Sequence, residues 1–211
     1  MIRHGITEGN LKRWFYGAAD IPLSEQGERK LEKLSEEGFY PELPSNTAYY
    51  TTGLKRTEQT LEIIYGDVEH DVIPELQEMN FGEYECKSFD ELNDDPVFLE
   101  WGYDRTDDVA LPGGESRNEF RARVKSGLEK LLALHNMRGE DASTLMICHG
   151  GVISMILEET FPGERESMWE WMPEPGYGYD IHVEDGRIVS AEVIGSLGDS
   201  LQDAIKEYSR G

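Results

Sequence analysis

The chain begins with Met1-Ile2-Arg3-His4-Gly5-Ile6-Thr7-Glu8-Gly9-Asn10, which is poor in the apolar residues of a core strand. These residues suit the binding of phosphate instead. Arg3 offers a planar fork of donors to two phosphate oxygens. His4 presents a neutral ring nitrogen as a nucleophile when a hydrogen bond to its other nitrogen fixes the tautomer. Gly5 lets the backbone approach a ligand closely. On their own, Arg3 and His4 also fit an ordinary surface terminus, so the interpretation depends on residues further along the chain.

Length and composition are typical of one globular domain. The chain has 211 residues, of which 38% are apolar and 30% are charged, and this is enough to bury a sizeable core. We therefore expect a single domain over residues 1–211. Cys86 and Cys148 are too few and too far apart for a disulfide framework or a zinc site, which favours a reducing compartment. With neither a membrane-length apolar run nor a secretory signal, the sequence predicts a cytoplasmic protein.

The charge balance is strongly acidic. There are 43 acidic and 20 basic residues, a formal net charge of -23. Such a surface repels nucleic acids and anionic membranes, so we expect neither as a partner. It also repels phosphorylated molecules. Any phosphate site must therefore be a local concentration of basic residues, which Arg3 and Arg56 can supply together with histidines.

Hydrophobic patterning predicts alternating strands and helices, and hence a three-layer α/β/α sandwich with a mostly parallel central sheet. A capping box at Ser116 and Glu119 marks the start of a long amphipathic helix. Residues 10–24 have the pattern of a loop, and residues 81–112 form a candidate cap insert with only weak helical signals. The remaining expected elements are strands at 48–52 and 144–148, a strand passing into a loop at 71–80, helices after Ser24 and at 54–65 and 152–159, a hairpin at 178–194 turning at Asp185-Gly186, and a short polar helix that closes the chain.

Two further candidate residues follow predicted strands directly. Arg56 lies where the strand ending at Thr52 passes into a helix, and His149 lies between a buried strand and the pair Gly150-Gly151. In open α/β sheets ligands bind at the carboxyl ends of the strands. The N-terminus of the helix that follows each strand also favours an anion. Both residues are therefore expected at the same edge of the sheet.

Together these motifs resemble the histidine phosphatase superfamily, which has the phosphoglycerate mutase-like fold. The resemblance covers about residues 1–155 and is specific because the motifs occur in the family's order. They are Arg3-His4-Gly5 with Asn10, Gly17-x-x-Asp20-x-Pro22-Leu23, Thr51-Thr52-Gly53-Leu54-x-Arg56-Thr57-x-Gln59-Thr60, Leu76-x-Glu78-x-x-Phe81-Gly82-x-x-Glu85, Pro112-Gly113-Gly114-Glu115-Ser116 and His149-Gly150-Gly151.

The resemblance implies a phosphohistidine mechanism that requires no metal and no cofactor. His4 would be the nucleophile, and Arg3, Arg56 and His149 would surround the phosphate oxygens. Glu78 would act as the proton donor to the leaving group; Glu75 and Glu85 are alternatives for that role. The phosphate-binding residues implied in addition are Asn10, Thr7, Gly17 and Gly150.

The sequence departs from the family pattern in three places. Only Met1 and Ile2 precede the Arg3-His4 motif, where the family normally has a longer apolar strand. This predicts either a shortened strand or a natural start upstream. Gly53 replaces the usual polar residue after a strand, and Cys86 stands where a glycine often follows the Glu85 position. We expect the last two to alter local loop geometry.

Several activities fit this pattern. The leading hypothesis is a hydrolase of small phosphomonoesters, in the small phosphatase branch that is similar to alpha-ribazole phosphatase. A cofactor-dependent phosphoglycerate mutase is the rival enzyme, but it needs extra basic residues for its substrate's second charged group. The expected cap contains only Lys87 and Arg105 as basic residues. A catalytically silent phospholigand-binding protein is the third possibility.

Overall fold

The computed structural model describes residues 1–194, and the expected closing helix lies outside them. Its centre is a four-stranded sheet in the order β1-β6-β3-β4. The strands are β1 (Ile2–Arg3), β3 (Thr47–Thr51), β4 (His70–Val72) and β6 (Ser143–Cys148). Every neighbouring pair is parallel, so all four carboxyl ends meet at one edge.

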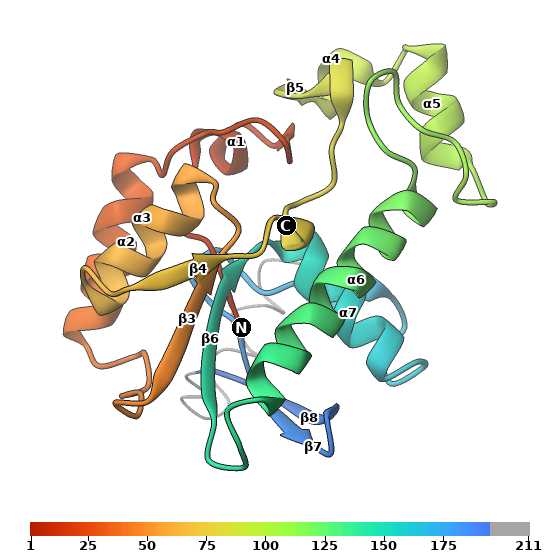
Figure 1. Ribbon diagram of the computed structural model, residues 1–211. Coiled ribbons are helices and arrows are strands. Elements are labelled where there is room, and N and C mark those ends of the chain that lie inside the picture. The colour runs from red at the N-terminus through yellow and green to blue at the C-terminus, as the bar shows by residue number, and fades with distance from the viewer. Residues whose placement is uncertain (195–211) are drawn as a thin grey trace.

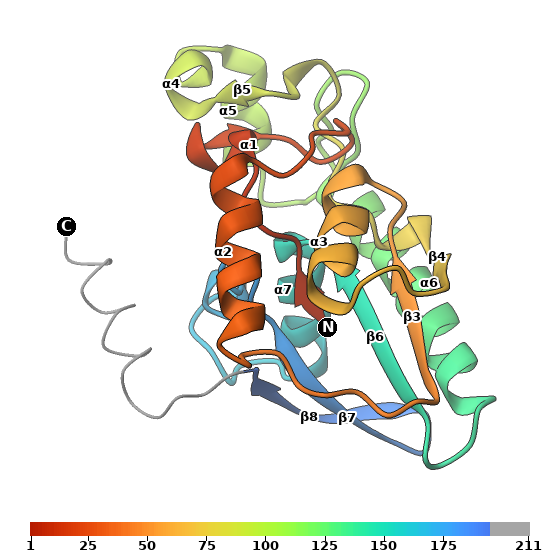
Figure 2. The same ribbon diagram turned by 90° about the vertical axis from the view of Figure 1, so that its left-hand side faces the viewer.

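Helices cover both faces of this sheet (Figure 1). On one side lie α2 (Glu25–Glu36) and α3 (Lys55–Tyr65), which contact each other. On the other side lie α6 (Arg117–Asn136) and α7 (Gly150–Thr160). Figure 2 shows α2 and α3 side by side from the front. The predicted three-layer sandwich is thus confirmed, and so is the capping box in which Ser116 and Glu119 begin α6.

Strand β6 carries the two halves of the hydrophobic core. Its side chains alternate between the faces of the sheet because successive residues of a strand point in opposite directions. Leu145 and Ile147 belong to the core on the α3 side. Met146 and Cys148 belong to the larger core that includes residues of α6 and α7. All four are almost completely buried, as the continuous apolar run predicts.

Strand β1 is short but is held on both sides. It pairs with β6 through Ile2 and Ile147. On its other side the Arg3 amide donates to the Tyr177 carbonyl at 2.9 Å, and the Tyr179 amide donates to the Met1 carbonyl at 2.8 Å. The hairpin of β7 (Tyr179–Glu184) and β8 (Arg187–Val193) follows directly. Its turn has positive φ at Asp185 and Gly186, as the predicted two-residue turn requires.

Residues 10–24 differ from the loop that their pattern predicts. They contain the end of the short helix α1 (Glu8–Leu11) and the strand β2 (Trp14–Phe15). Helix α1 starts with a capping box between Thr7 and Asn10. Strand β2 pairs with β5 (Lys87–Ser88), more than 70 residues later. A pairing at such separation has no local signal, and this explains the missed strand.

The segment that the sequence marks as a cap lies beyond the carboxyl edge of the sheet (Figure 1). Here Phe15 of β2 packs edge-to-face on Phe81, Phe98 and Trp101. The segment's role as a cap, and the single domain, stay predictions. Within residues 1–194 no helix is both long and apolar enough to cross a membrane. The elements after β4 are η1 (Pro74–Leu76), η2 (Gly82–Tyr84), β5, α4 (Phe89–Leu92), α5 (Pro96–Tyr103) and, after α7, η3 (Met168–Trp171).

Cys86 adopts the left-handed conformation at the start of β5. Its φ is 62°, a region that glycine enters freely and that other residues enter at a cost. Its amide donates to the Phe15 carbonyl at 2.7 Å, so the pairing of β2 with β5 holds the residue in this conformation. The replacement of the family's glycine by Cys86 therefore puts local strain into the loop.

A comparison of Cys86→Gly with Cys86→Ala measures that strain. Both variants remove the thiol, but only glycine relieves the left-handed backbone. We expect the glycine variant to have the larger free energy of unfolding, by about 1 kcal/mol, in urea denaturation monitored by circular dichroism. Equal stabilities of the two variants would show that the backbone at this position is not strained.

Candidate active site

The predicted site residues meet at the carboxyl edge of the sheet. His4 follows β1, Arg56 lies in the first turn of α3, and His149 is the N-cap residue of α7. The rings of His4 and His149 are 5.3 Å apart, centroid to centroid. The parallel arrangement of the strands explains this convergence, because β1 and β6 are neighbours in register and deliver both histidines to one point.

His4 is held in one tautomer. Its Nδ1 atom lies 2.7 Å from the carbonyl oxygen of Gly5. A carbonyl oxygen can only accept a hydrogen bond, so the proton is on Nδ1. The Nε2 atom then carries the lone pair, which is the state that a nucleophilic imidazole needs. The side chain is only 3% exposed, and this restricts the ring to a single orientation.

Arg56 is completely buried and is positioned by backbone carbonyl groups. It donates from Nη1 to the Ala19 carbonyl at 2.8 Å and from Nη2 to the Gly17 carbonyl at 2.7 Å. Its guanidinium also lies over the ring of Tyr16, with Cζ 5.1 Å from the centroid. A carbonyl dipole orients a guanidinium but does not neutralise its charge, so the positive charge of Arg56 remains available to an anion.

Arg3 lies against the start of α7. Its Nη1 atom donates to the Pro173 carbonyl at 2.8 Å. A Cβ atom at Gly150 would come within 3.0 Å of both Cζ and Nε of this guanidinium. Gly150 therefore makes room for Arg3 beside the N-terminus of α7. Direct contact of Gly150 with phosphate stays a prediction.

Three nitrogen atoms at this edge are buried and have no hydrogen-bond partner among the residues that the structure describes. They are Nε of Arg3, Nε of Arg56 and Nδ1 of His149, and we call them the three open nitrogens. A buried polar group without a partner costs about 1–3 kcal/mol, and a charged one costs more. The two guanidinium Nε–H groups are donors, and an oxyanion is the kind of ligand that accepts from them. The observation therefore points to an oxyanion site.

Burial, helped by the two guanidinium groups, keeps both histidines neutral. Burial is the main reason that the pKa of His4 lies well below its usual range, and the charges of Arg56 and Arg3 lower it further. Burial is also the main reason that the pKa of His149 is lowered, and Arg56, His4 and Arg3 lower it further, in that order. A neutral His4 retains its lone pair at neutral and mildly acidic pH.

Glu78 lies at the N-terminus of α7, the helix whose N-cap residue is His149. Its Oε2 atom accepts from the Gly151 amide at 2.8 Å, and its Oε1 atom accepts from the Met79 amide at 3.0 Å. A Cβ atom at Gly151 would lie 2.4 Å from Oε1, so a larger residue there would displace the Glu78 carboxyl group from this position. Arg123 fixes the surrounding loop, since its Nη2 atom donates to the Glu78 carbonyl at 3.1 Å.

Glu75 and Glu85, the alternatives to Glu78 as proton donor, have other partners. The Glu85 carboxylate accepts hydrogen bonds from the amides of Phe81 and of the loop Gly17–Ala19. This is the loop whose carbonyl groups hold Arg56. Glu75 faces Lys130 of α6, with 3.3 Å between their charged atoms. The geometry thus favours Glu78 as the acid, and Glu85 serves the loop.

The other predicted phosphate ligands also have structural roles. Thr7 caps α1 and its hydroxyl lies 2.7 Å from the hydroxyl of Tyr16. The Oδ1 atom of Asn10 accepts from the Thr7 amide at 2.9 Å, which leaves its side-chain NH₂ group as the donor that a phosphate could use. Gly17 contributes the carbonyl that holds Arg56. Direct contacts of these residues with phosphate stay predictions.

Sequence reasoning missed two residues at this site. Tyr16 packs between Thr7 and Arg56, and its ring centroid is 6.5 Å from that of His4. Nothing in the run Trp14-Phe15-Tyr16 distinguishes it from the aromatic residues beside it. Thr52 lies 2.9 Å from Nε2 of His149. Its position at the carboxyl end of a parallel strand is the signal that could have identified it.

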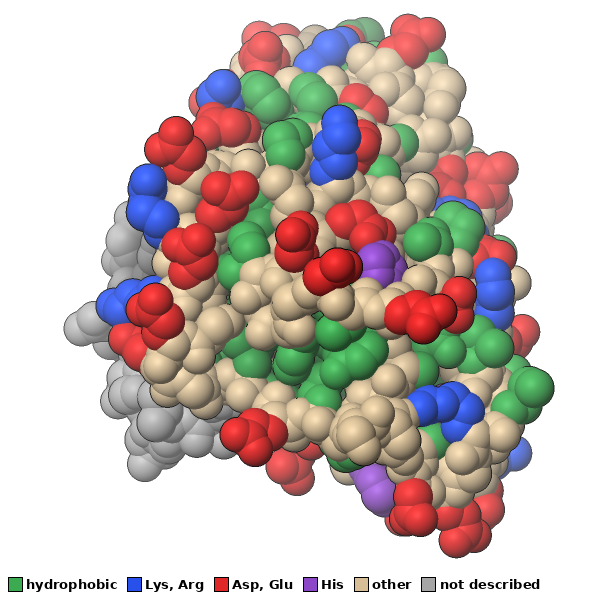
Figure 3. All heavy atoms as spheres, turned by 60° about the vertical axis from the view of Figure 1, so that its left-hand side comes forward, with side chains coloured by type: hydrophobic (Ala, Val, Ile, Leu, Met, Phe, Trp, Pro, Cys, Tyr) green, Lys and Arg blue, Asp and Glu red, His purple; other side chains and the backbone are tan. Residues whose placement is uncertain are grey.

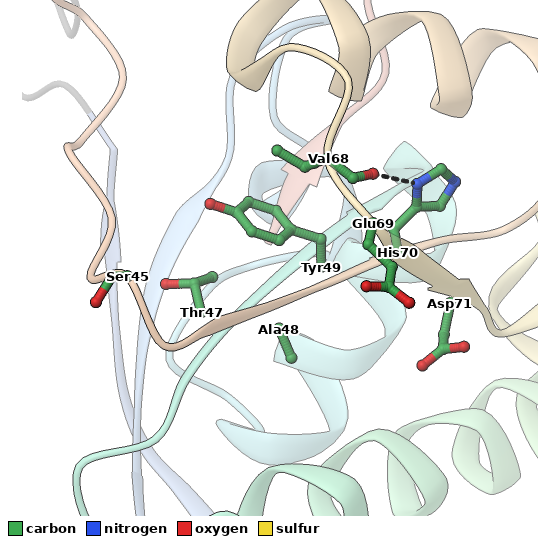
Figure 4. Close-up of a pocket in the computed structure, with 8 residues that line it drawn as sticks. All are labelled: Ser45, Thr47, Ala48, Tyr49, Val68, Glu69, His70 and Asp71. Carbon is green, nitrogen blue, oxygen red and sulfur yellow. Dashed lines mark hydrogen bonds between the residues drawn. The ribbon is translucent and has the colours of Figure 1, made fainter.

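A hollow elsewhere on the described part of the chain lacks these residues. One open hollow of about 540 Å³ lies beside the amino-terminal half of β3 and along β4, at the opposite end of β3 from Thr52 (Figure 4). None of the predicted site residues lines it. On the face seen in Figure 3, acidic side chains are scattered with basic ones between them. The strongest case for an anion site is therefore the carboxyl edge.

Comparisons with known proteins agree with this geometry. Residues 1–193 match the family described as the histidine phosphatase superfamily (branch 1). A probable phosphoglycerate mutase GpmB from an Enterobacter species is 32% identical over 164 residues, which cover 74% of this chain and 71% of the relative. The adenosylcobalamin/alpha-ribazole phosphatase of Salmonella typhimurium is 26% identical over 190 residues, covering 88% and 90% of the two chains.

A solved structure shows the same fold. The crystal structure of a putative alpha-ribazole-5'-P phosphatase from Escherichia coli has a TM-score of 0.77 at 24% identity, and the match covers 92% of this chain and 94% of that one. On the family match and these likenesses, the protein belongs to the histidine phosphatase superfamily. The resemblance inferred from the sequence motifs is confirmed.

The buried neutral histidines predict how stability depends on pH. Below pH 6.5 the unfolded chain binds protons at both histidines, while the folded protein keeps both rings neutral. The free energy of unfolding should therefore fall as pH decreases from 6.5 to 5.5, by up to about 1.4 kcal/mol per pH unit for each histidine. Urea denaturation in phosphate-free buffer at each pH measures this free energy of unfolding.

Two variants isolate the contribution of His149 to this pH dependence of stability. His149→Gln should have a shallower decline in stability with acidity than the unaltered protein. His182→Gln removes an exposed histidine of β7 and should keep the full slope. A His149→Gln slope equal to that of the unaltered protein would contradict the assignment of a neutral, buried His149.

Proposed function

We propose that the protein is a phosphomonoester hydrolase that acts on a small phosphorylated metabolite through a phosphohistidine at His4. The observation that supports this proposal is that the three open nitrogens belong to residues at the same sheet edge as His4, whose Nε2 atom is unprotonated and whose ring lies 5.3 Å from that of His149, centroid to centroid. Phosphoryl transfer through a loose transition state needs in-line positioning and fixed donors around the equatorial oxygens. Arg3, Arg56 and His149 supply such donors.

In the first step, the Nε2 lone pair of His4 attacks phosphorus and the bond from phosphorus to the leaving oxygen breaks. The protonated carboxyl group of Glu78 gives its proton to that oxygen, so an alcohol departs and a carboxylate remains. The charge on the transferring group stays close to the two guanidiniums throughout. Since their positions are fixed by backbone carbonyl groups, they need little rearrangement to stabilise it.

In the second step, water attacks the phosphorus of phosphohistidine and the phosphorus–nitrogen bond breaks. The Glu78 carboxylate takes a proton from the attacking water, which restores its acid form, and inorganic phosphate leaves. His4 regains its Nε2 lone pair, while its Nδ1–H group keeps its hydrogen bond to the Gly5 carbonyl. The cycle then closes without an external proton carrier.

A phosphoglycerate mutase is the second candidate, because the relative that is 32% identical is named as a probable one. Such an enzyme must hold the substrate's carboxylate as well as its phosphate. Of the two basic residues in the cap segment, Lys87 lies over the ring of Tyr84, 4.8 Å from its centroid, and Arg105 is exposed. This poor supply of cations supports hydrolysis over the mutase reaction.

The protein should hydrolyse p-nitrophenyl phosphate in the presence of EDTA, and His4→Ala should lower kcat at least about 10³-fold because the nucleophile is lost. His70→Ala, which removes an exposed histidine of β4, is the matched control and should retain activity. Interconversion of 2- and 3-phosphoglycerate that depends on bisphosphoglycerate would select the mutase instead. Phosphate binding without turnover of any phosphoester would leave a silent binding protein.

The acid role of Glu78 can be tested with two leaving groups. Glu78→Gln should slow hydrolysis of an alkyl phosphate by about 10²–10⁴-fold. Hydrolysis of p-nitrophenyl phosphate should slow much less, because nitrophenolate leaves without a proton. Glu75→Gln removes the alternative carboxylate, which faces Lys130, and should change neither rate. Equal losses for both substrates in Glu78→Gln would exclude it as the acid.

A further inference from the structure

Glu78 lies in a stretch of chain that belongs to no helix or strand. The short helix η1 ends at Leu76, and residues 77–81 that follow it are irregular. We call residues 75–80 the acid segment. Backbone carbonyl groups outside a regular helix or sheet need other hydrogen-bond partners where water does not reach them. The partners of the acid segment therefore decide where the Glu78 carboxyl group is held.

Arg123 of α6 provides partners for three of these carbonyl groups. Its Nη1 atom donates to the carbonyl oxygens of Glu75 at 3.0 Å and Gln77 at 2.9 Å. Its Nη2 atom donates to that of Glu78 at 3.1 Å. One guanidinium thus binds most of the carbonyl groups around the acid. Because Arg123 stands on a helix of 20 residues, a rigid element sets the position of the acid segment.

Glu115 fixes the orientation of this guanidinium group. Its carboxylate accepts from Nε of Arg123 at 3.1 Å and also from Nη2. A guanidinium has five N–H donors, and these two contacts together with the three carbonyl groups match that number. Glu115 also accepts from the Asn80 amide at 2.9 Å and donates its own amide to the Asn80 carbonyl at 3.0 Å. The pair of Glu115 and Arg123 therefore holds the acid segment at both ends.

The contacts of the acid segment show what this arrangement positions. The loop Gly17–Ala19 packs tightly against it, because a Cβ atom at Gly17 would lie 1.7 Å from the Met79 carbonyl oxygen. The Glu78 carboxylate accepts from the Gly151 amide at the start of α7 at 2.8 Å. Helix α6 thus holds the backbone of Glu78, and helix α7 receives its carboxyl group. A shift of the acid segment moves that group relative to α7.

We propose that Arg123 is a positioning residue for Glu78, which together with Glu115 holds the acid segment so that the carboxyl group stays at the N-terminus of α7. The inference rests on the proposed function, in which Glu78 protonates the leaving oxygen. The five contacts of the Arg123 guanidinium are with carbonyl groups and the Glu115 carboxylate. Its effect on the reaction is therefore exerted through the position of Glu78.

The test compares Arg123→Lys with Arg121→Lys. Lysine keeps the charge, but its ammonium group has three donors and no fork, so it cannot replace five contacts. Arg121 is the matched control, because it stands on the same helix and pairs with Asp107 and Glu159 instead. The measured quantity is kcat/KM, which covers the steps up to phosphoryl transfer to His4 and excludes the later attack by water.

Arg123→Lys should lower kcat/KM for an alkyl phosphate by about 10–10²-fold, because the carboxyl group is displaced but not removed. It should change kcat/KM for p-nitrophenyl phosphate by less than about 2-fold, since that leaving group needs no proton. In a Glu78→Gln background Arg123→Lys should have no further effect on the alkyl phosphate, because Arg123 acts through that carboxyl group. Arg121→Lys should change neither rate.

Amide hydrogen exchange gives a second readout that does not depend on turnover. The Gly151 amide lies in the first turn of α7, where a helix offers it no backbone acceptor, and its partner is the Glu78 carboxylate. We expect NMR to show this amide exchanging at least about 10-fold faster in Arg123→Lys and at the unaltered rate in Arg121→Lys. Glu115→Gln should accelerate it in the same direction, and this variant carries both tests if Arg123→Lys does not fold.

The outcomes separate this inference from the proposed hydrolase. Equal losses for the two substrates would show that Arg123 merely stabilises the fold, and an unchanged exchange rate of the Gly151 amide would show that it does not hold Glu78. Either result overturns the inference. If the exchange rate responds as expected but the unaltered protein hydrolyses no phosphoester, Arg123 still positions Glu78 and the hydrolase proposal fails.

Discussion

The site depends on one electrostatic constraint. Two guanidiniums and two imidazoles share an interior edge of the sheet, and among residues 1–194 no carboxylate forms an ion pair with Arg56. A buried charge is tolerated when dipoles and hydrogen bonds surround it. Here the dipoles are the carbonyls of Gly17 and Ala19. These carbonyls do not neutralise the positive charge of Arg56, even though the net charge of the chain is -23. Local geometry, and not overall charge, therefore creates an attractive site for an anion.

The carboxylates of Glu85 and Glu115 hold the loops on the two sides of this edge. Glu85 collects the amides of residues 17–19 and Phe81 on one side. The peptide unit between residues 17 and 18 donates its N–H group to Glu85 and directs its carbonyl group at Arg56. On the other side, Glu115 pairs with Arg123 and accepts from the Asn80 amide at 2.9 Å, while Arg123 binds the carbonyl of Glu78. Acidic residues thus support the candidate site indirectly, through peptide groups.

The sequence predicts the parts of this structure whose signals are local. The apolar run of β6, the capping box at Ser116 and the turn at Asp185-Gly186 each appear where their patterns place them. Strand β2 was missed because its partner β5 is far along the chain. Within the site, the strand-end rule located Arg56 and His149. Glu85 instead accepts from the amides of a loop far earlier in the chain, and no local residue pattern encodes such contacts.

The shortness of β1 has a consequence for when the protein becomes functional. Its two residues are aligned by β6 on one side and by residues 177–179 on the other, so the strand that precedes His4 is placed by segments that a ribosome makes much later. Contacts of such long sequence separation form slowly and late in folding. A nascent chain can form α2 and α3 early, yet the backbone that leads into His4, the proposed nucleophile, is not fixed on both sides until residues 177–179 have emerged.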